Sequence, residues 1–145
     1  MVVKTYRGLL ASGAQERIKL QTSAGKVGYR IVKFQIMPDD PFTETVKLVV
    51  KIFKSTQSTI DDTVNFTDSD LLGVATSMET ADLDQAGYGV IIFDREVFNQ
   101  DIFITNFEAT AAESANYYLE LEVIPLASDE AAITTVKAMR GLAVD

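Results

Sequence analysis

The stretch from residue 89 to residue 124 decides the fold: GVIIFDREVFNQDIFITNFEATAAESANYYLELEVI. Polar, turn-forming segments separate three apolar runs of strand length in it, at residues 90–93, 101–107 and 117–124. In the last run every second residue from Tyr117 to Val123 is apolar, and two of the residues between them are glutamates. This alternation is typical of a strand with one buried face, so the stretch predicts a mostly antiparallel sheet.

Composition limits the classes of function. The 145 residues suit one domain, which buries about 68–70% of the surface of its unfolded chain and needs no covalent staples. The chain has no cysteine and no histidine. Disulfides, thiolate metal sites and cysteine nucleophiles are excluded, and the commonest general base and imidazole ligand are missing. We expect no catalytic residue, no cofactor and no enzymatic activity.

The net charge of −8, from 21 acidic and 13 basic residues, repels phosphate backbones, so we expect no nucleic-acid partner. No apolar run reaches the roughly 20 residues that span a bilayer, and we expect no membrane partner. The first residues, MVVKTYRGLLASG, lack the continuous apolar core of a signal peptide. We therefore expect synthesis in a cytoplasm, with the mature chain starting at Met1 or Val2.

Other strands are expected where apolar residues alternate or cluster. They are residues 4–10, 16–22, 27–37, 44–54 and 71–78, with polar loops at 55–70 and 79–87. The small residues 11–14 suit a turn, so the first two strands are expected to form a hairpin. The breaks within the stretch 89–124 likewise favour hairpins over helices.

The strand at residues 44–54 has a clear pattern. Alternate residues from Val46 to Ile52 are expected to face the core. Lys47, Lys51 and Lys54 are expected on its exposed side, where charges keep an apolar strand from pairing with a stray edge.

After Pro125 the periodicity becomes helical. Ser128 or Asp129 is expected to cap a helix over residues 130–140, and Gly141 is expected to end it. The residues spaced for one apolar face are Ala132, Ile133, Val136 and Met139.

The pattern as a whole predicts a mainly β fold, an antiparallel β-sandwich with one short C-terminal helix, for which jelly roll is the first choice and another sandwich topology the alternative. The single domain spans residues 1–145, with an N-terminal arm at residues 1–3 and a helix and tail at residues 128–145.

Acidic loops and adjacent tyrosines are the candidate chemistry. Asp61, Asp62, Asp68 and Asp70 lie within ten residues, and Asp82 and Asp84 follow in the next loop. Oxygen ligands at this density suit Ca²⁺, but the spacing of a calcium-binding loop is missing, so solvated loops that cap turns are the favoured interpretation and no metal site is predicted. Tyr117 and Tyr118 could form a stacking platform for a sugar or a base. The favoured interpretation is that one of them lies in the core and the other beside a neighbouring strand.

Three segments carry a resemblance to a known class of proteins: GYGVIIFDREVFNQDIFITNFE, NYYLELEVIPL and TTVKAMRG. They resemble small virion structural proteins of marine tailed bacteriophages, including cyanophages, over roughly residues 87–141, with a weaker similarity at 28–40. The resemblance implies a β-sandwich that sits on or within the particle as a capsid, cement, decoration or tail component. It carries over no site residues.

We therefore expect a non-enzymatic capsid cement or decoration subunit, assembled in the host cytoplasm and located in the virion. Its expected partners are capsid protein and copies of itself, in a homo-oligomeric assembly. The partner-contact candidates are the apolar terminal residues Met1, Val2, Val3, Leu142, Ala143 and Val144. The alternatives are a main shell or tail or fibre protein, and a carbohydrate-binding β-sandwich module that uses Tyr88, Tyr117 or Tyr118 with Ca²⁺ from the acidic loops.

Overall fold

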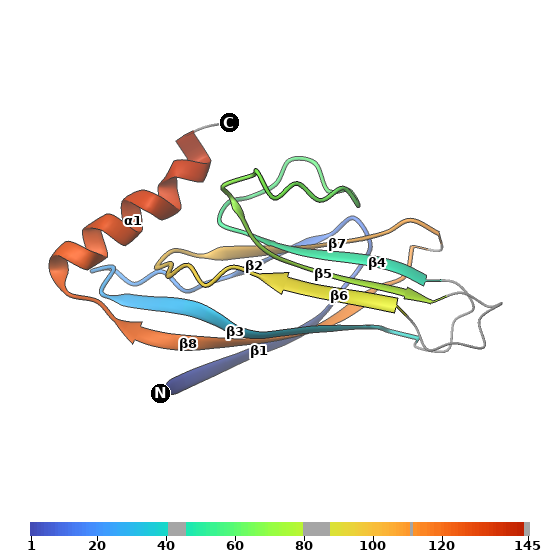
Figure 1. Ribbon diagram of the computed structural model, residues 1–145, viewed down its shortest axis with the longest axis horizontal. Helices are drawn as coiled ribbons and strands as arrows, with labels where there is room; N and C mark the ends of the chain where they lie inside the picture. Colours follow the sequence, from blue (N-terminus) through green and yellow to red (C-terminus); the bar gives the residue numbers. More distant parts are fainter. Residues whose placement is uncertain (41–45, 80–87, 111, 144–145) are drawn as a thin grey trace.

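The computed structural model describes residues 1–40, 46–79, 88–110 and 112–143. Its elements are β1 (Val2–Leu10), β2 (Gln15–Ile18), β3 (Val27–Pro38), β4 (Val46–Phe53), β5 (Leu71–Glu79), β6 (Tyr88–Phe93), β7 (Ile102–Glu108), β8 (Ala115–Pro125) and α1 (Ser128–Ala143). The strands form two facing layers, and α1 lies at one end of them, on the side of the N-terminus (Figure 1). The expected mainly β, antiparallel sandwich with one C-terminal helix is confirmed.

The two sheets have the strand orders β1-β8-β3 and β2-β7-β4-β5-β6, and every neighbouring pair is antiparallel. Strands β4, β5 and β6 follow one another as a meander. Strands β7 and β8 instead lie between strands that come much earlier in the chain, an interleaving typical of Greek-key connections. The jelly-roll topology stays a prediction.

The expected N-terminal hairpin is wrong. β1 pairs with β8 and β2 pairs with β7, so residues 11–14 carry the chain from one sheet to the other. The turn is held by the N–H of Gly13, which donates to the carbonyl of Asn106 at 2.7 Å, and Gly13 adopts a φ of 79°. An alternating strand can face the core from either sheet, so the local pattern does not specify its partner.

The hairpins expected within residues 89–124 are also wrong. β6 pairs with β5, β7 with β2 and β4, and β8 with β1 and β3, so none of the three strands pairs with another. The connection from β7 to β8 carries the chain from one sheet to the other, whereas β6 and β7 belong to the same sheet. The connection between β6 and β7 contacts the other sheet through an antiparallel bridge between Phe98 and Tyr29.

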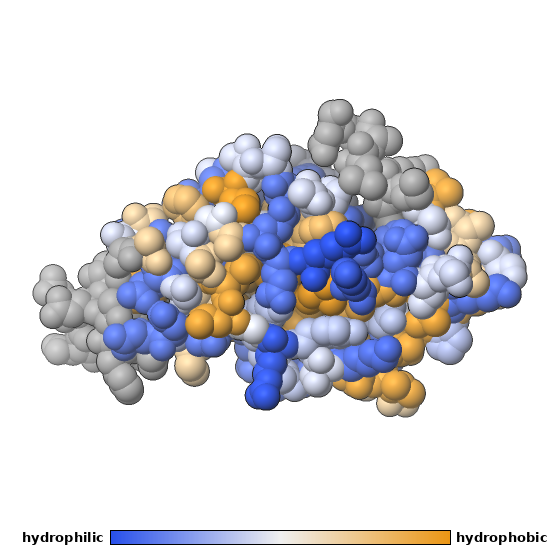
Figure 2. Space-filling view, turned by 180° about the vertical axis from the view of Figure 1, so that it is seen from behind, coloured by the Kyte–Doolittle hydropathy of each residue, from blue (hydrophilic) through white to orange (hydrophobic). Residues whose placement is uncertain are grey.

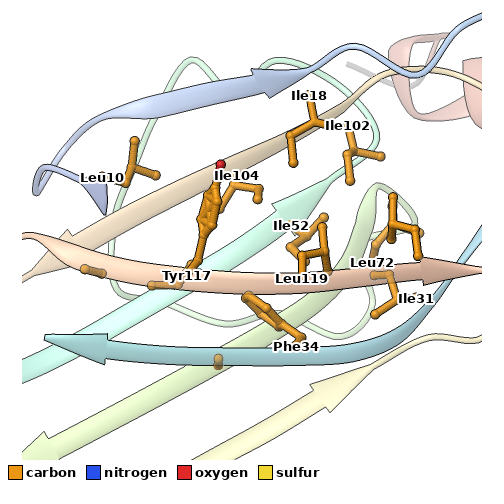
Figure 3. Close-up of a cluster of buried hydrophobic side chains, with 14 of the residues drawn as sticks. Leu10, Ile18, Ile31, Phe34, Ile52, Leu72, Ile102, Ile104, Tyr117 and Leu119 are labelled. Carbon is orange, nitrogen blue, oxygen red and sulfur yellow. The ribbon is translucent and has the colours of Figure 1, made fainter. Parts of the chain in front are cut away.

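The core lies between the sheets and confirms the predicted inward faces. In β8, Tyr117, Leu119 and Leu121 are buried, and in β4 the alternate residues from Val46 to Ile52 are buried. Figure 3 shows side chains from both sheets meeting in this layer. Those labelled are Leu10, Ile18, Ile31, Phe34, Ile52, Leu72, Ile102, Ile104, Tyr117 and Leu119.

A bulge in β3 explains why no single face of that strand is apolar in the sequence. Ile31 pairs with Leu121 while Lys33 pairs with Glu120, so one extra residue is inserted between them. The core-facing residues change from odd numbers, such as Ile31, to even numbers, such as Phe34. A bulge shifts the two-residue period by one, so alternation cannot be read across it.

The three lysines of the fourth strand do not share one exposed side. Lys47 is exposed, but Lys51 is only 6% exposed, and its Nζ lies 3.1 Å from Asp61 and 2.8 Å from the carbonyl of Thr63. Lys54 pairs with Glu96 at 2.8 Å. β4 is a central strand whose outer face is covered by the following loop, so the expectation of an exposed, protective lysine is wrong for Lys51. It is also wrong for Lys54, whose side chain is 7% exposed.

The helix begins at Ser128, one of the two expected caps, but it packs by a different face and runs through residue 141 to Ala143. Ile133 and Val136 are 58% and 57% exposed, whereas Ala131 is buried. The predicted apolar face and the predicted stop at residue 141 are therefore wrong. Ala132 is exposed as well, and the side chain of Met139 lies outside the described part of the chain.

Polar contacts decide how the helix docks. Asn99 is fully buried, and its Nδ2 donates to the carbonyl of Gly25 at 2.9 Å and to Oγ1 of Thr135 at 2.7 Å. Thr135 in turn donates to the carbonyl of Ala131. These bonds hold the first turns of α1 against the loop that precedes β3. No helix in the described residues has the length and apolar character that a membrane span requires.

Candidate functional site

A groove of about 760 Å³ lies on the described surface. We call it the β3–β8 groove, because the C-terminal part of β3 and the N-terminal part of β8 form most of its wall. The residues that line it are Arg7, Gly8, Leu9, Gln35, Ile36, Met37, Ile91, Asn116, Tyr117 and Tyr118. Three of them stand side by side across three strands, because Arg7 and Gln35 both pair with Tyr118. The groove thus combines apolar walls with convergent polar groups.

The two adjacent tyrosines have different environments, as predicted. Tyr117 is 4% exposed, and burial together with a hydrogen bond to Glu16 raises the pKa of its phenol well above the usual range. It belongs to the core and offers no free ring face. Tyr118 points to the outer side of the sheet, where its hydroxyl donates to Glu120 at 2.8 Å and Lys33 lies 5.8 Å from its ring centroid. The hydrogen bond to Glu120 raises the pKa of Tyr118.

The four aspartates of the first acidic loop serve separate local contacts. Asp61 accepts from Lys51 and from Thr63, and its hydrogen bond with Thr63 is the main reason that its pKa is lowered. Asp68 accepts the N–H of Asp70 at 2.9 Å, a contact that closes a turn. Asp61 and Asp68 do line one shallow pocket of about 170 Å³, together with Lys51.

The remaining aspartates do not complete a metal site. Asp70 is 5% exposed and accepts hydrogen bonds from Ser55 and Gln57, and Asp62 is exposed. Among the described residues no group of three or more acidic side chains is placed to hold a metal ion. Asp82 and Asp84 lie outside the described residues, as does most of the loop that carries them.

Sequence reasoning missed a second acidic cluster, because its members come from distant parts of the chain. Glu108, at the end of β7, is 3% exposed and accepts the backbone N–H groups of Lys47 and Glu113. A hydrogen bond shared with Asp39 is the main cause that raises the pKa of Glu113, and burial and the charges of Asp39, Asp40 and Glu108 add to it. Glu108 thus joins the start of β4 to the segment between β7 and β8.

The proposed N-terminal contact residues are part of a strand rather than an arm. Val2 and Val3 belong to β1 and pair with Val123 and Glu122 of β8, so the expected arm at residues 1–3 is wrong in its form. Met1 is 89% and Val2 is 65% exposed. Leu142 and Ala143 end α1, although nothing is described of their side chains, and Val144 lies outside the described residues.

Strand β6 is a surface that the sequence did not single out. Three of its residues, Val90, Ile91 and Ile92, are 38%, 45% and 47% exposed. The strand lies at the end of the five-stranded sheet. Seen from behind, the surface mixes hydrophilic residues with several separate apolar groups (Figure 2). The signal that could have found β6 is its uncharged sequence, YGVIIF.

Comparison with known proteins gives no relative. No protein-family model matches the chain, and neither the curated proteins nor the solved structures contain a match.

Proposed function

We propose that this protein is a non-enzymatic structural subunit of a tailed-bacteriophage virion, a capsid cement or decoration protein. In this proposal it stabilises the shell by burying its surface against capsid protein and copies of itself, after assembly in the host cytoplasm. The resemblance of residues 87–141 to small virion proteins suggests the class, and the surface of the sandwich supports it. We include the jelly-roll topology in this proposal.

The observation that carries the proposal is the placement of exposed apolar side chains. Nine of them lie at or on the edge strands β1 and β6 and on α1, and they are Met1, Val2, Val3, Leu9, Val90, Ile91, Ile92, Ile133 and Val136. Four more, Met37, Val64, Phe66 and Met78, are exposed elsewhere on the described surface. Open edges with apolar residues are sites of pairing with other chains, and natural proteins cover or charge them unless a partner occupies them. A subunit that works through contacts needs such surfaces.

The buried charges support a structural role as well. Lys51 holds one loop through Asp61, and Glu108 holds the start of β4 and the segment after β7 through the backbone N–H groups of Lys47 and Thr110. The hydrogen bonds of these charged groups therefore fix the loop after β4 and the segment after β7. Rigid outer loops favour repeated contacts, because little conformational freedom is lost when a partner binds.

Mass spectrometry of purified tailed-phage particles whose genome encodes this sequence tests the proposal. A cement subunit is expected at a copy number that is a simple ratio to the main shell protein, and it should be released without dissolving the shell. The dominant band of the particle would indicate the main shell protein, and a few copies per particle would indicate a tail or fibre component. Absence from the particle would overturn the virion role.

A second candidate function, glycan binding, is favoured by the β3–β8 groove. Tyr118 lines the groove, together with the polar residues Arg7, Gln35 and Asn116. Aromatic faces with convergent hydrogen-bonding groups suit sugar rings. A glycan array followed by titration of the best ligand tests this candidate, and Tyr118→Ala should abolish binding. The control Phe66→Ala removes an exposed aromatic ring outside the groove and should not abolish it. The array showing no ligand would remove the candidate.

A further inference from the structure

The free side of strand β6 presents backbone groups that have no strand partner among the described residues. The N–H of Val90 points toward β5, where it donates to Oγ1 of Thr76 at 3.3 Å, and the N–H of Asp94 donates to the carbonyl of Leu72 at 2.8 Å. Successive residues of a strand point their N–H and C=O groups to opposite sides. Those of Ile91 therefore face the open side.

β6 differs from the other strands at the edges of the two sheets. β1 carries Lys4 and Arg7, β2 carries Glu16 and Arg17, and β3 carries Arg30 and Lys33, whereas β6 has no charged residue. Charges on an edge strand discourage pairing with another chain. The uncharged edge is also the one where three consecutive β-branched side chains are partly exposed, as described above. It is thus the edge best suited to accept a strand.

The charge of the protein and the symmetry of antiparallel pairing identify the occupant. Two copies that each carry a net charge of −8 repel one another, so a contact between copies is favoured where it is free of charge. β6 meets that condition. An antiparallel pair formed by two identical strands has a two-fold axis, which is the symmetry of the commonest homodimers. A strand that is uncharged and open therefore suits a second copy of itself.

We propose that β6 pairs antiparallel with β6 of a second copy of this chain, around a two-fold axis at Ile91. The two five-stranded sheets then continue into each other. This inference deepens the proposed function, because it rests on a protein that works through contacts between copies and it names the surface that makes them.

The orientation of the backbone fixes the register of the pair. Because the N–H and C=O groups of Ile91 face the open side, Ile91 can exchange both hydrogen bonds with Ile91 of the partner subunit. Gly89 then faces Phe93 of the partner subunit, and Val90 faces Ile92 of the partner subunit. The side chain of Ile91 also lines the β3–β8 groove with Ile36 and Met37, so pairing brings further apolar surface of β3 toward the axis.

A single engineered cysteine tests this register. The chain has no cysteine of its own, so Ile91→Cys introduces a unique thiol. In a hydrogen-bonded antiparallel pair the two Cα atoms lie about 5.5 Å apart, within the roughly 4.4–6.8 Å that a disulfide spans. The matched control is Ile133→Cys on α1, which is at least as exposed. Under mild oxidation I91C should form covalent dimers rapidly and I133C should not. Equal rates for the two folded variants would overturn the register.

Charge variants test the pairing without covalent cross-linking. In I91K the two lysines stand directly opposite each other across the axis, and like charges there oppose pairing. We expect sedimentation equilibrium to show the wild type as a dimer and I91K with a dissociation constant at least tenfold higher, about 1.4 kcal/mol. I91E should behave like I91K, and an equimolar mixture of the two should recover dimers. The matched control I133K should remain dimeric, and circular dichroism checks that each variant is folded.

The outcomes separate this inference from the proposed function. A wild-type protein that stays monomeric, although it is found in virus particles, would overturn the self-pairing and leave the virion role in place. If that monomer loses its binding to shells through I91K alone, the occupant of the β6 edge is capsid protein rather than a second copy. A β6 dimer of a chain that is absent from particles would support the pairing and overturn the virion role.

Discussion

The ammonium group of Lys51 lies 3.1 Å from a carboxylate oxygen of Asp61, and this contact fastens the loop after β4 across the outer face of the sheet. The side chain of Lys51 is 7% exposed, whereas that of Asp61 is 43% exposed. The Nζ atom of Lys51 also lies over the ring of Phe53, 5.6 Å from the ring centroid. Lys51 is therefore the buried partner of the ion pair, and Asp61 is the partly exposed one.

Removing only Asp61 should lower the stability of the protein more than removing both partners of the ion pair. Asp61→Ala leaves the buried ammonium without its carboxylate, and we expect a loss of about 1–3 kcal/mol in the free energy of unfolding. In the double variant K51M/D61A the buried charge is gone as well, so part of that loss should be recovered. Urea unfolding of the wild type, both single variants and the double variant measures the coupling. D61A with unchanged stability would contradict this account of the pair.

The helix should depend on Asn99 rather than on its apolar residues. Asn99→Ala removes the donor to Thr135 and to Gly25 and leaves buried acceptors unpaired, so we expect a loss of about 1–3 kcal/mol. Amide hydrogen exchange of α1 should accelerate at the same time. Ile133→Ala changes an exposed residue of the same helix and should alter stability by less than about 0.5 kcal/mol. The opposite ranking would show that the apolar face holds the helix.

Acid should weaken the protein partly through Asp101. Burial opposes the ionisation of this carboxyl, but hydrogen bonds from the N–H groups of Gln21 and Leu20 and from Arg17 outweigh it and lower the pKa below its ordinary value of 3.8. A lowered folded pKa stabilises the protein above the unfolded value, and this stability is lost as the pH falls through the folded pKa.

The test of Asp101 is a pH series of melting temperatures for the wild type and Asp101→Asn. At pH 7 we expect the variant to be less stable by about 1.5–3 kcal/mol, since hydrogen bonds to a charged acceptor are lost. The difference should shrink below about pH 4, as the wild-type carboxyl takes up its proton. A difference that is constant from pH 7 to pH 2 would contradict the role of ionisation.

Glu113 should have the opposite effect. The hydrogen bond shared with Asp39 is the main reason that the pKa of Glu113 is raised above 4.5, so the charged form of Glu113 is disfavoured in the folded state. Stability from this group is therefore present at low pH and is lost as the pH rises through the folded pKa. Glu113→Gln should melt at a higher temperature than the wild type at pH 7, and the gain should vanish below about pH 4.5.

Asp62→Asn is the matched control for Glu113, because it removes the same charge from an exposed loop position. If both variants raise the melting temperature equally, the gain comes from the lower net charge of the protein and the acidic cluster has no specific part in it.

The sequence predicted most of the elements because the relevant signals are local. Leu119 and Leu121 lie in an alternating run, and they face the core as expected. Ser128 begins the helix where a capping residue was expected. Each of these features follows from the geometry of a few neighbouring residues, which the chain carries wherever its strands are placed.

The candidate surfaces were harder to predict because they depend on contacts between distant residues. The sequence indicated the exposed Met1 and Val2 as contact residues, but the place of Val2 in β1 comes from pairing with β8. The acidic cluster joins Asp39 to Glu113, and the β3–β8 groove brings Ile91 beside Met37. No spacing along the chain encodes such meetings, and the loop aspartates that spacing did suggest serve separate contacts.

The sequence by itself determined that this is an acidic, mainly β domain without cysteine or histidine, and which face of β4 and β8 turns inward. Only the tertiary structure decided that Lys51 is buried, that Asn99 holds the helix, and that β6 ends its sheet with an uncharged edge. The physical reason is the separation along the chain between the residues that determine each feature. Alternation is a property of adjacent residues, whereas sheet partners, loop coverage and open edges arise from long-range pairing in which many arrangements satisfy the same local pattern.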